Sequence, residues 1–385
     1  MSTQSESAIA QVNRNHFLRE FTYSNQRFKT GEGQEREFAD SAIWIDDLLI
    51  LQEIKERQSE KVSQNPEEQA KWYESKVRGK AVDQLKRTMD GLGGRNPILL
   101  TNERGHVVDI GKCTATTIHK LVVFSPSPFL SPVLVKRKAY ISERIGFVHF
   151  FTLYDYQKMC ANLVTPLEIA EYLTWRQNIC LHLPEECNAV TEKALVGQFL
   201  VGNDESGPSE DFEEYVDHLD QEVRHVNIFG LLSGFSDSIK SGEWGKKYYF
   251  ILKELAKLKR NMIKEFDDRL VWAIRNCRKN TFKRPTRMSI PEYDCSYVIV
   301  PIVKEVATWS KYLETCTSLT KYDLKTRKAI GISIAPQTAF SKELHVDYCY
   351  MEGEWQYDQN EEDLLCNGDL FRPTRGKEVG KYGFK

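Results

Sequence analysis

The chain has 385 residues, 41% of them hydrophobic and 28% charged, and its 53 Lys and Arg nearly balance its 55 Asp and Glu to a net charge of −2. This length allows two or three domains, and the charge balance excludes a protein that is basic overall, so any nucleic-acid surface must be local. The polar N-terminal residues MSTQSESAIAQ and the lack of an apolar run of membrane-spanning length predict a cytoplasmic protein that makes no membrane contact.

The first predicted elements belong to a small α/β domain over residues 1–125. A polar tail at residues 1–12 is expected to lead into a short amphipathic helix around Arg14–Phe21. Apolar residues three or four positions apart predict a long helix from about Pro66 to Leu92. Further strands of this domain are expected at 97–100 and 118–124.

Between these helices the sequence predicts a β-hairpin. It consists of the strand-like Ser41–Ile45, a turn at Asp46–Asp47 and the apolar run Leu48–Leu51. Side chains alternate between the two faces of a strand, so Glu53 and Lys55, which follow the apolar run, project together. Charges at the end of a central strand need partners, and a metal ion or an anionic substrate would provide them.

Two more regions are predicted after residue 125, where three prolines between 126 and 132 mark a boundary. Residues 126–202 are expected to extend the first domain with strands and helices. Residues 203–385 are expected to form a C-terminal α+β domain for substrate or partner recognition, entered through an acidic segment over 204–222. Its predicted elements are a long helical region at 247–278, a helix near 309–319, and strands at 297–304, 329–335 and 344–350.

The charged residues around the hairpin are of the types that hydrolyse phosphodiesters with a metal ion. Mg²⁺ prefers oxygen ligands and keeps several waters, so two carboxylates and a backbone carbonyl are enough to hold it. Asp40, Glu53 and the carbonyl of Ile54 are the candidate ligands, and Lys55 is the candidate for orienting or deprotonating the attacking water. The competing interpretation is that Glu53 and Lys55 form an exposed ion pair at the end of a strand.

The order of these residues, Asp40, twelve residues, then Glu53–Lys55, resembles the PD-(D/E)XK nuclease superfamily over roughly the first third of the chain. The resemblance implies a restriction-endonuclease-like αβββαβ core. It also implies an acidic site residue from the first helix, for which Glu20 fits by position and Glu37 competes. Lys80–Leu85 is similar to a KxxxQL pattern in the branch related to nuclease-related domains, which makes Gln84 a further catalytic candidate and Lys80 a nucleic-acid-binding one.

The chain departs from the family pattern at one point, and a choice of ligand stays open. The residue before Asp40 is Ala39, where the family pattern has proline. Either Asp46 or Asp47 could be the carboxylate that binds the metal in place of Asp40, although turn residues are the simpler interpretation of this pair.

Cations gather in a second place, the tail of the long helical region after residue 247. Lys257, Lys264 and Arg275 are candidates for binding nucleic acid there, although basic residues also occur on the exposed faces of ordinary helices. The sequence thus predicts a Mg²⁺-dependent nuclease, with Mn²⁺ as a substitute, that cleaves DNA, while RNA stays open. The resemblance implies a context in prokaryotic restriction or anti-phage defence. The alternative is a non-catalytic subunit on a nuclease-like fold that binds nucleic acid, a protein partner or a second copy of itself.

Overall fold

The structure is a computed structural model, and it describes residues 3–29, 35–57, 62–92, 97–202, 206–222, 247–281, 283–302, 309–336, 344–368 and 370–372. The chain divides into two compact units, Met1–His225 and Val226–Lys385. The expected boundary at residue 203 lies too early. The C-terminal half of the acidic segment forms α9 (Glu213–Glu222), which packs on α8 (Glu192–Val201) of the first unit. Asp204 and Glu205 lie outside the described residues.

The first unit is built on a mixed sheet of six strands in the order β1-β4-β5-β8-β10-β9, so the expected mixed α/β class is confirmed. Strands β5, β8 and β10 are parallel, while β4 runs antiparallel to both β1 and β5, and β9 runs antiparallel to β10. The bounds of these strands are Thr22–Ser24 (β1), Ser41–Ile45 (β4), Leu48–Lys55 (β5), Thr117–Phe124 (β8), Ala139–Ser142 (β9) and Gly146–Thr152 (β10). Two small hairpins pair β2 (Arg27–Lys29) with β3 (Glu35–Glu37) and β6 (Leu99–Thr101) with β7 (Val107–Asp109).

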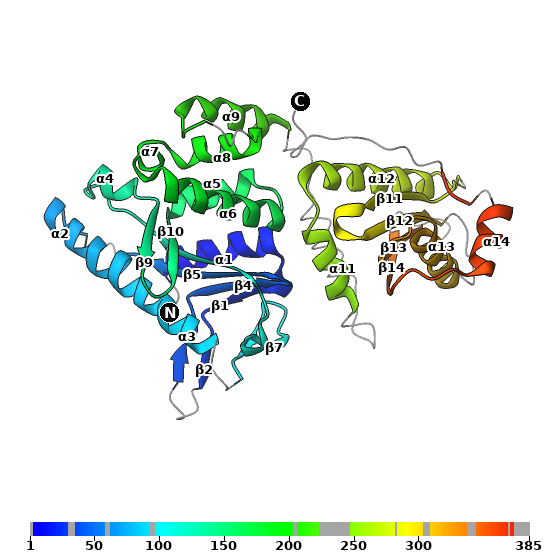
Figure 1. The fold of residues 1–385 in the computed structure, drawn as a ribbon, viewed down its shortest axis with the longest axis horizontal. Coiled ribbons are helices and arrows are strands. Elements are labelled where there is room, and N and C mark those ends of the chain that lie inside the picture. The colour runs from blue at the N-terminus through cyan, green and yellow to red at the C-terminus, as the bar shows by residue number, and fades with distance from the viewer. Residues whose placement is uncertain are drawn as a thin grey trace. The chain divides into compact units, whose positions relative to one another are not determined.

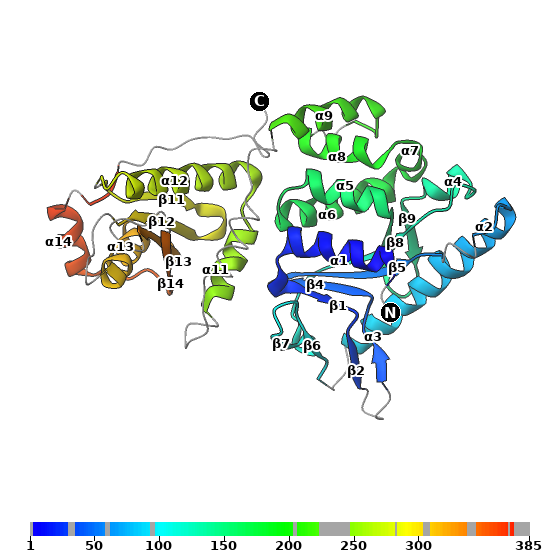
Figure 2. The same ribbon diagram turned by 180° about the vertical axis from the view of Figure 1, so that it is seen from behind.

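Helices cover both faces of this sheet (Figures 1 and 2). On one face lie α1 (Gln4–Phe17) and α5 (Leu153–Asn162), and on the other lies the long helix that ends in α3 (Ala81–Leu92). The other helices are α4 (Pro132–Val135), α6 (Pro166–His182) and α7 (Pro184–Ala189), and short 3₁₀ turns occur at Arg19–Phe21, Ile110–Lys112 and Glu210–Phe212. Residues 126–202 therefore do extend the first unit, because β9 and β10 join its sheet.

The N-terminal helix begins about ten residues earlier than expected. Residues 4–12 are helical and not a polar tail, because Thr3 and Glu6 form a capping box at the helix start. The helix buries Ile9 and Phe17, whose spacing follows the helical repeat, against the sheet. It ends at Leu18, whose φ of 66° is incompatible with a continuing helix.

The long helix over 66–92 is confirmed, but its middle is not α-helical. It consists of α2 (Pro66–Trp72), a π-helical segment (Tyr73–Lys80) and α3. At the end of the π segment the N–H of Ala81 donates to the carbonyl oxygen of Lys76, five residues back. Buried apolar residues at every fourth position hold this helix on the sheet: Tyr73, Val77, Ala81 and Leu85.

The second unit contains a four-stranded sheet in the order β11-β12-β13-β14, with β12 and β13 parallel. Its strands are Thr286–Ile290 (β11), Cys295–Pro301 (β12), Lys328–Pro336 (β13) and Leu344–Glu352 (β14), so three expected strands are confirmed, while Lys304 lies outside the described residues. The expected long helical region is two helices, α11 (Lys247–Ala256) and α12 (Arg260–Arg278), and α13 (Trp309–Asp323) and α14 (Gln359–Asn367) follow. Within the described ranges, no helix combines the length and apolarity that crossing a membrane requires.

Candidate active site

The β4–β5 hairpin brings Asp40 and Glu53 together. Ser41 pairs with Gln52 at the end of this antiparallel ladder, and continuing its register by one step would put Asp40 opposite Glu53. Residues directly opposite on antiparallel strands project to the same face. Glu53 is 1% exposed and Asp40 is 6% exposed, so both carboxylates are removed from bulk water. Of the three candidate carboxylates, Asp40 is the one that lies next to Glu53.

Lys55 joins these carboxylates from two residues further along β5. Its Nζ lies 3.0 Å from Asp40 Oδ2, 2.9 Å from Glu53 Oε2 and 3.0 Å from the carbonyl oxygen of Ile54. The backbone N–H of Ile54 also donates to Asp40 Oδ2, at 2.6 Å. One ammonium group therefore contacts the three oxygen groups that the sequence suggested as metal ligands, Asp40, Glu53 and Ile54.

Burial and mutual charge set the protonation of this group. Burial raises the pKa of Glu53 well above its usual value, and the adjacent Asp40 carboxylate raises it further, against the opposing effect of Lys55. Burial lowers the pKa of Lys55, but the charges of Glu53 and Asp40 outweigh that effect and raise the pKa above its usual value. Lys55 is consequently a charged ammonium here. A further cation near the two carboxylates would stabilise their ionised forms.

The cluster opens into a cleft of about 340 Å³. One wall is acidic and comes from α1, the end of β3 and the hairpin. The other wall is one face of the long helix. Residues lining the acidic side are Glu6, Glu37, Asp40, Ile54, Lys55 and Glu56, and residues lining the helical side are Trp72, Lys76, Lys80 and Gln84.

Gln84 and Lys80 thus lie at the same cleft as the hairpin residues. Gln84 Oε1 is buried and accepts no hydrogen bond from any residue in the described ranges, so it is available to a ligand. Lys80 is exposed on the cleft wall.

Glu20 is not brought to the cleft. It lies in the 3₁₀ turn after α1, where its carboxylate binds Arg104 at 2.8 Å. Thr22, two residues after Glu20, pairs with Ile43 on β4, and Ile43 pairs with Ile50 on β5. Glu20 therefore lies near the level of Ile50, which is five residues or about 17 Å along β5 from Lys55, at ~3.3 Å per strand residue. The competitor Glu37 does line the cleft, and burial, then the Asp40 charge, raises its pKa.

The sequence analysis missed Glu6 and Lys76 as cleft residues. The signal for Glu6 was present, because Thr3-Gln4-Ser5-Glu6 has the spacing of a capping box and would have located the start of α1. Asp46 and Asp47 form the hairpin turn at the other end of β5, and the Asp47 carboxylate accepts from Thr116. Neither turn residue lies near Glu53.

The oxygen atoms around Lys55 Nζ fit a divalent cation, since an ammonium already lies among them and two carboxylates with one carbonyl are a sufficient set for Mg²⁺. In the part of the chain that the structure describes, no three or more His, Cys, Asp and Glu side chains form a metal-binding group. A metal here would therefore depend on water and substrate oxygens for its remaining ligands.

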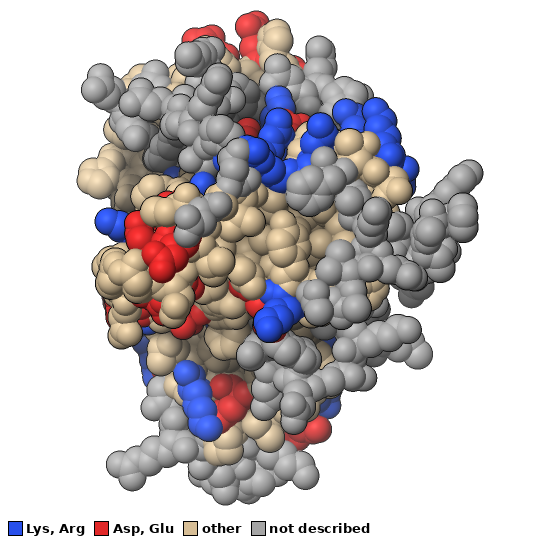
Figure 3. Space-filling view, turned by 90° about the vertical axis from the view of Figure 1, so that its right-hand side faces the viewer, with Lys and Arg blue, Asp and Glu red and all other residues tan. Residues whose placement is uncertain are grey.

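The cations proposed for nucleic-acid binding in the second unit differ in their surroundings. Lys257 is half-buried and donates to Glu254 of α11 at 3.2 Å, so its charge is already paired within the fold. Lys264 and Arg275 are exposed on α12. Lys and Arg side chains gather in the upper part of the face shown in Figure 3. Exposed cations at and after the end of α12 include Arg275, Arg278, Lys279, Lys283 and Arg284.

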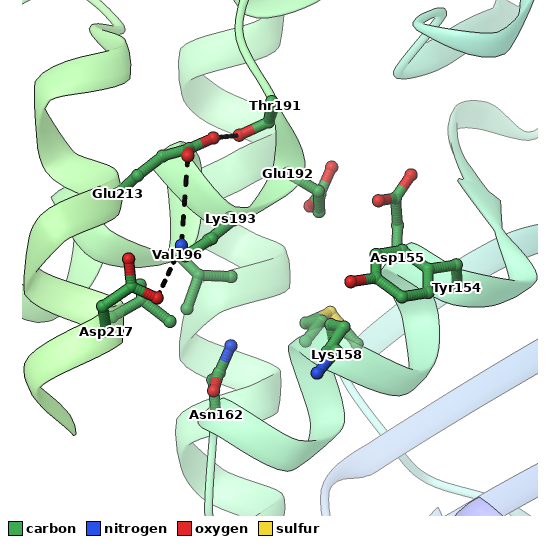
Figure 4. A pocket seen from close by; sticks show the side chains of 12 residues that line it. Tyr154, Asp155, Lys158, Asn162, Thr191, Glu192, Lys193, Val196, Glu213 and Asp217 are labelled. Atoms are coloured by element: carbon green, nitrogen blue, oxygen red, sulfur yellow. Dashed lines mark hydrogen bonds and ion pairs between the residues drawn. The ribbon is translucent and has the colours of Figure 1, made fainter. Parts of the chain in front are cut away.

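A second hollow, of about 380 Å³, lies between α5, α8 and α9 (Figure 4). Several of its charged groups are held in ion pairs. Lys193 Nζ lies 2.7 Å from Asp217 and 3.9 Å from Glu213, while Glu192 binds the buried Arg176 behind the wall. The first cleft has more to offer a ligand than this hollow, because Gln84 Oε1 in the first cleft has no hydrogen-bond partner among the described residues.

Comparisons of this chain with family models, curated proteins and solved structures find no match. What the cleft can do follows from its own groups. The acidic wall can hold a cation, the lysines of the helical wall can hold an anion, and Lys55 lies where the two would meet. A phosphate with an associated divalent cation has this distribution of charge.

Proposed function

We propose that the first unit is a Mg²⁺-dependent nuclease that hydrolyses phosphodiester bonds of DNA. The observation that carries this proposal is the convergence of Asp40, Glu53 and Lys55 at one end of the sheet, with Lys55 Nζ 2.9–3.0 Å from both carboxylates. Burying two carboxylates and an amine at the mouth of a cleft is costly, and a surface ion pair would not require it. Mn²⁺ is expected to substitute for Mg²⁺.

The order of secondary structure supports this proposal. From the N-terminus the first unit has α1, the antiparallel strands β1, β4 and β5, the helix ending in α3, and β8 parallel to β5. With the two small hairpins β2–β3 and β6–β7 left out, this order is compatible with the αβββαβ core that the resemblance to restriction-endonuclease-like nucleases implies. Asp40 comes directly before β4, and Glu53 and Lys55 come from β5.

Each residue has a defined task in the proposed reaction. Hydrolysis joins the oxygen of one water to phosphorus, breaks one P–O bond to a sugar, and leaves that sugar oxygen with a proton. Asp40, Glu53 and the Ile54 carbonyl would hold the cation, which when bound stabilises negative charge on the phosphate. The Lys55 ammonium can orient the attacking water and stabilise charge on the phosphate oxygens. Gln84, with its unpaired Oε1, can accept a hydrogen bond from that water.

The test is cleavage of plasmid DNA in Mg²⁺ by the wild type and by Asp40→Ala, Glu53→Ala and Lys55→Ala. Each substitution is expected to reduce the rate by at least about a hundredfold, the usual effect of removing a group that acts in the transition state. Asp90→Ala is a matched control, since Asp90 is an exposed carboxylate of α3 paired only with Arg144 at the surface. Equal cleavage by the wild type and the three site variants would overturn the proposal.

A second candidate function is non-catalytic binding of nucleic acid, favoured by the exposed cations at the end of α12. From Leu270 to Pro291 the chain has no Asp or Glu, and Arg372 lies over the ring of Trp272 with its Cζ 4.8 Å from the centroid. Cations beside an aromatic side chain suit phosphate and base contacts. Binding without cleavage is the expected result, and charge reversal at Lys264 and Arg275 should weaken it more than reversal at Lys257, which is held by Glu254.

A further inference from the structure

The helical wall of the cleft has a regular spacing that an α-helix would not align. Trp72, Lys76, Lys80 and Gln84 all line the cleft and lie exactly four positions apart. An α-helix has 3.6 residues per turn, so side chains at this spacing drift steadily around its axis. Over the twelve residues from Trp72 to Gln84 that drift would carry the first side chain well away from the face of the last.

The π-helical segment removes this drift. A π-helix closes i→i+5 hydrogen bonds and so takes more than four residues for each turn, which makes side chains at a spacing of four drift in the opposite direction. The segment occupies Tyr73–Lys80, between α2 and α3, and so offsets the α-helical drift on either side of it. Lys76 and Lys80 therefore stay in line with Gln84 along the cleft.

Lys76 and Lys80 differ from two other cations of this helix, Arg78 and Lys86, in having no ion-pair partner among the described residues. Arg78 pairs with Glu74 at 2.5 Å, and Lys86 pairs with Asp83 at 3.0 Å. Lys76 and Lys80 are exposed, and neither side chain forms an ion pair or hydrogen bond with any other residue in the described ranges. Two like charges four positions apart on a helix repel each other, so an anion bound between them would relieve that repulsion.

We propose that the π-helical segment is a positioning device that presents Lys76 and Lys80 to the cleft, where they bind a backbone phosphate of DNA beside Asp40, Glu53 and Lys55. This inference rests on the proposed nuclease function, because it assigns the substrate contacts of the same cleft. Lys76 is a residue that the sequence analysis did not suggest for any site.

The experiment measures binding of the full chain to a short DNA duplex by fluorescence anisotropy, with EDTA present so that the duplex is not cleaved. Lys76→Ala and Lys80→Ala are compared with Lys86→Ala, a matched control on the same helix whose lysine is held by Asp83. Each cleft variant is expected to weaken binding by roughly threefold to tenfold and to reduce the slope of log K against log salt by about 0.9. Lys86→Ala should change neither quantity.

A charge-relocation variant tests the helical register itself. Ser75→Lys/Lys76→Ala keeps the net charge of the protein and moves the cation by one position, to a residue that lines a different hollow with Glu68 and Glu74. If the register matters, this double variant binds DNA as weakly as Lys76→Ala. If it binds as tightly as the wild type, only the general charge of the helix matters and the positioning role is overturned.

The outcomes separate this inference from the nuclease proposal. Weakened binding in the two cleft variants, with no Mg²⁺-dependent cleavage by the wild type, would retain the phosphate site and remove the catalytic function. Cleavage by the wild type, with unchanged binding and cleavage in Lys76→Ala and Lys80→Ala, would retain the nuclease and overturn the inference. Absence of salt-dependent DNA binding by the wild type would also overturn the inference. Circular dichroism of each variant verifies that the helix still folds.

Discussion

Asp40 and Glu53 directly adjoin Ser41 and Gln52, the last pair of the β4–β5 ladder, and a single ammonium group, Lys55 Nζ, lies within 3.0 Å of both carboxylates. With both carboxylates ionised, these three groups carry one net negative charge in a nearly buried position, and burial and Asp40 raise the pKa of Glu53 against that state. Removing any one of them leaves the others without adequate compensation, because a buried charge that loses its partner keeps the full cost of its desolvation. Binding of a cation would consequently change the charge balance among Asp40, Glu53 and Lys55.

Replacing Lys55 should therefore separate metal binding from catalysis. We expect Lys55→Met to bind Mn²⁺ about tenfold more tightly than the wild type, or about 1.4 kcal/mol, because the variant removes a positive charge from among the ligand oxygens. Isothermal titration calorimetry measures the affinity, and the plasmid assay should show that the same variant is inactive. Asp40→Asn is the matched comparison, since it removes a ligand and should abolish binding. Weaker Mn²⁺ binding by Lys55→Met than by the wild type would show that the lysine does not compete with the metal.

The pairing of Asp40 with Glu53 could be predicted from the sequence. A two-residue turn at Asp46–Asp47 puts Ile45 opposite Leu48, and five further steps along each strand put Asp40 opposite Glu53. The sequence predicts the turn and the first strand of this hairpin correctly, and these two features determine which residues face each other across it. Alternation of side chains then put Lys55 on the same face as Glu53.

Other parts of the site could not be predicted from the local spacing of residues in the sequence. The buried residues Tyr73, Val77, Ala81 and Leu85 lie four apart throughout, whereas the apolar stripe of an α-helix mixes spacings of three and four. So short a run of such spacings also occurs where an α-helical stripe drifts around the helix, so the pattern alone does not distinguish the π-helical segment. Glu20 was chosen for its position in a predicted helix that in fact ends at Leu18. The charged cleft wall around Lys76 depends on which helix face meets the hairpin, and that is a tertiary contact.

Stability of the first unit is expected to depend on one buried ion pair behind the sheet. Arg176, on α6, is 0% exposed and binds Glu192 at 2.8 and 3.0 Å. Burial raises the pKa of Glu192, but Arg176 and Lys138 outweigh that effect and lower it to about 2. Glu192→Gln should reduce the free energy of unfolding by about 3–5 kcal/mol, because it leaves a buried guanidinium without its counter-charge.

The matched control for Glu192 is the pair of Arg144 with Asp90, which has a similar separation of 2.7 Å but side chains that are 64% and 47% exposed. Asp90→Asn should cost less than about 1 kcal/mol, since exposed pairs gain little in water. Urea denaturation followed by circular dichroism measures both variants. Equal costs for the buried and the exposed pair would contradict the assigned role of Arg176.

Two neighbouring histidines should make the first unit less stable in mild acid. His119 on β8 and His149 on β10 are buried, with ring centroids 5.5 Å apart. Burial, with a further contribution from Lys120, lowers the pKa of His119 to about 4, and burial together with Arg176, His119 and Lys120 lowers the pKa of His149 well below its usual value. Both side chains are therefore neutral in the folded protein at pH values where an unfolded histidine is protonated.

The sign of the effect follows from proton linkage. The unfolded chain has a histidine pKa near 6.5, so below that pH it binds protons that the folded protein does not, and the free energy of unfolding falls as the pH falls from about 6.5 toward 4. For His119 the loss between pH 7 and pH 5 should be about 2 kcal/mol. Urea denaturation at a series of pH values measures this loss, and His119→Gln should reduce it by that amount. His182→Gln provides the control, because it replaces an exposed histidine at the end of α6, where the ring contacts the Asn178 carbonyl, and leaves the buried pair of histidines intact. An identical pH dependence in the wild type and His119→Gln would mean that His119 is not held neutral by its burial.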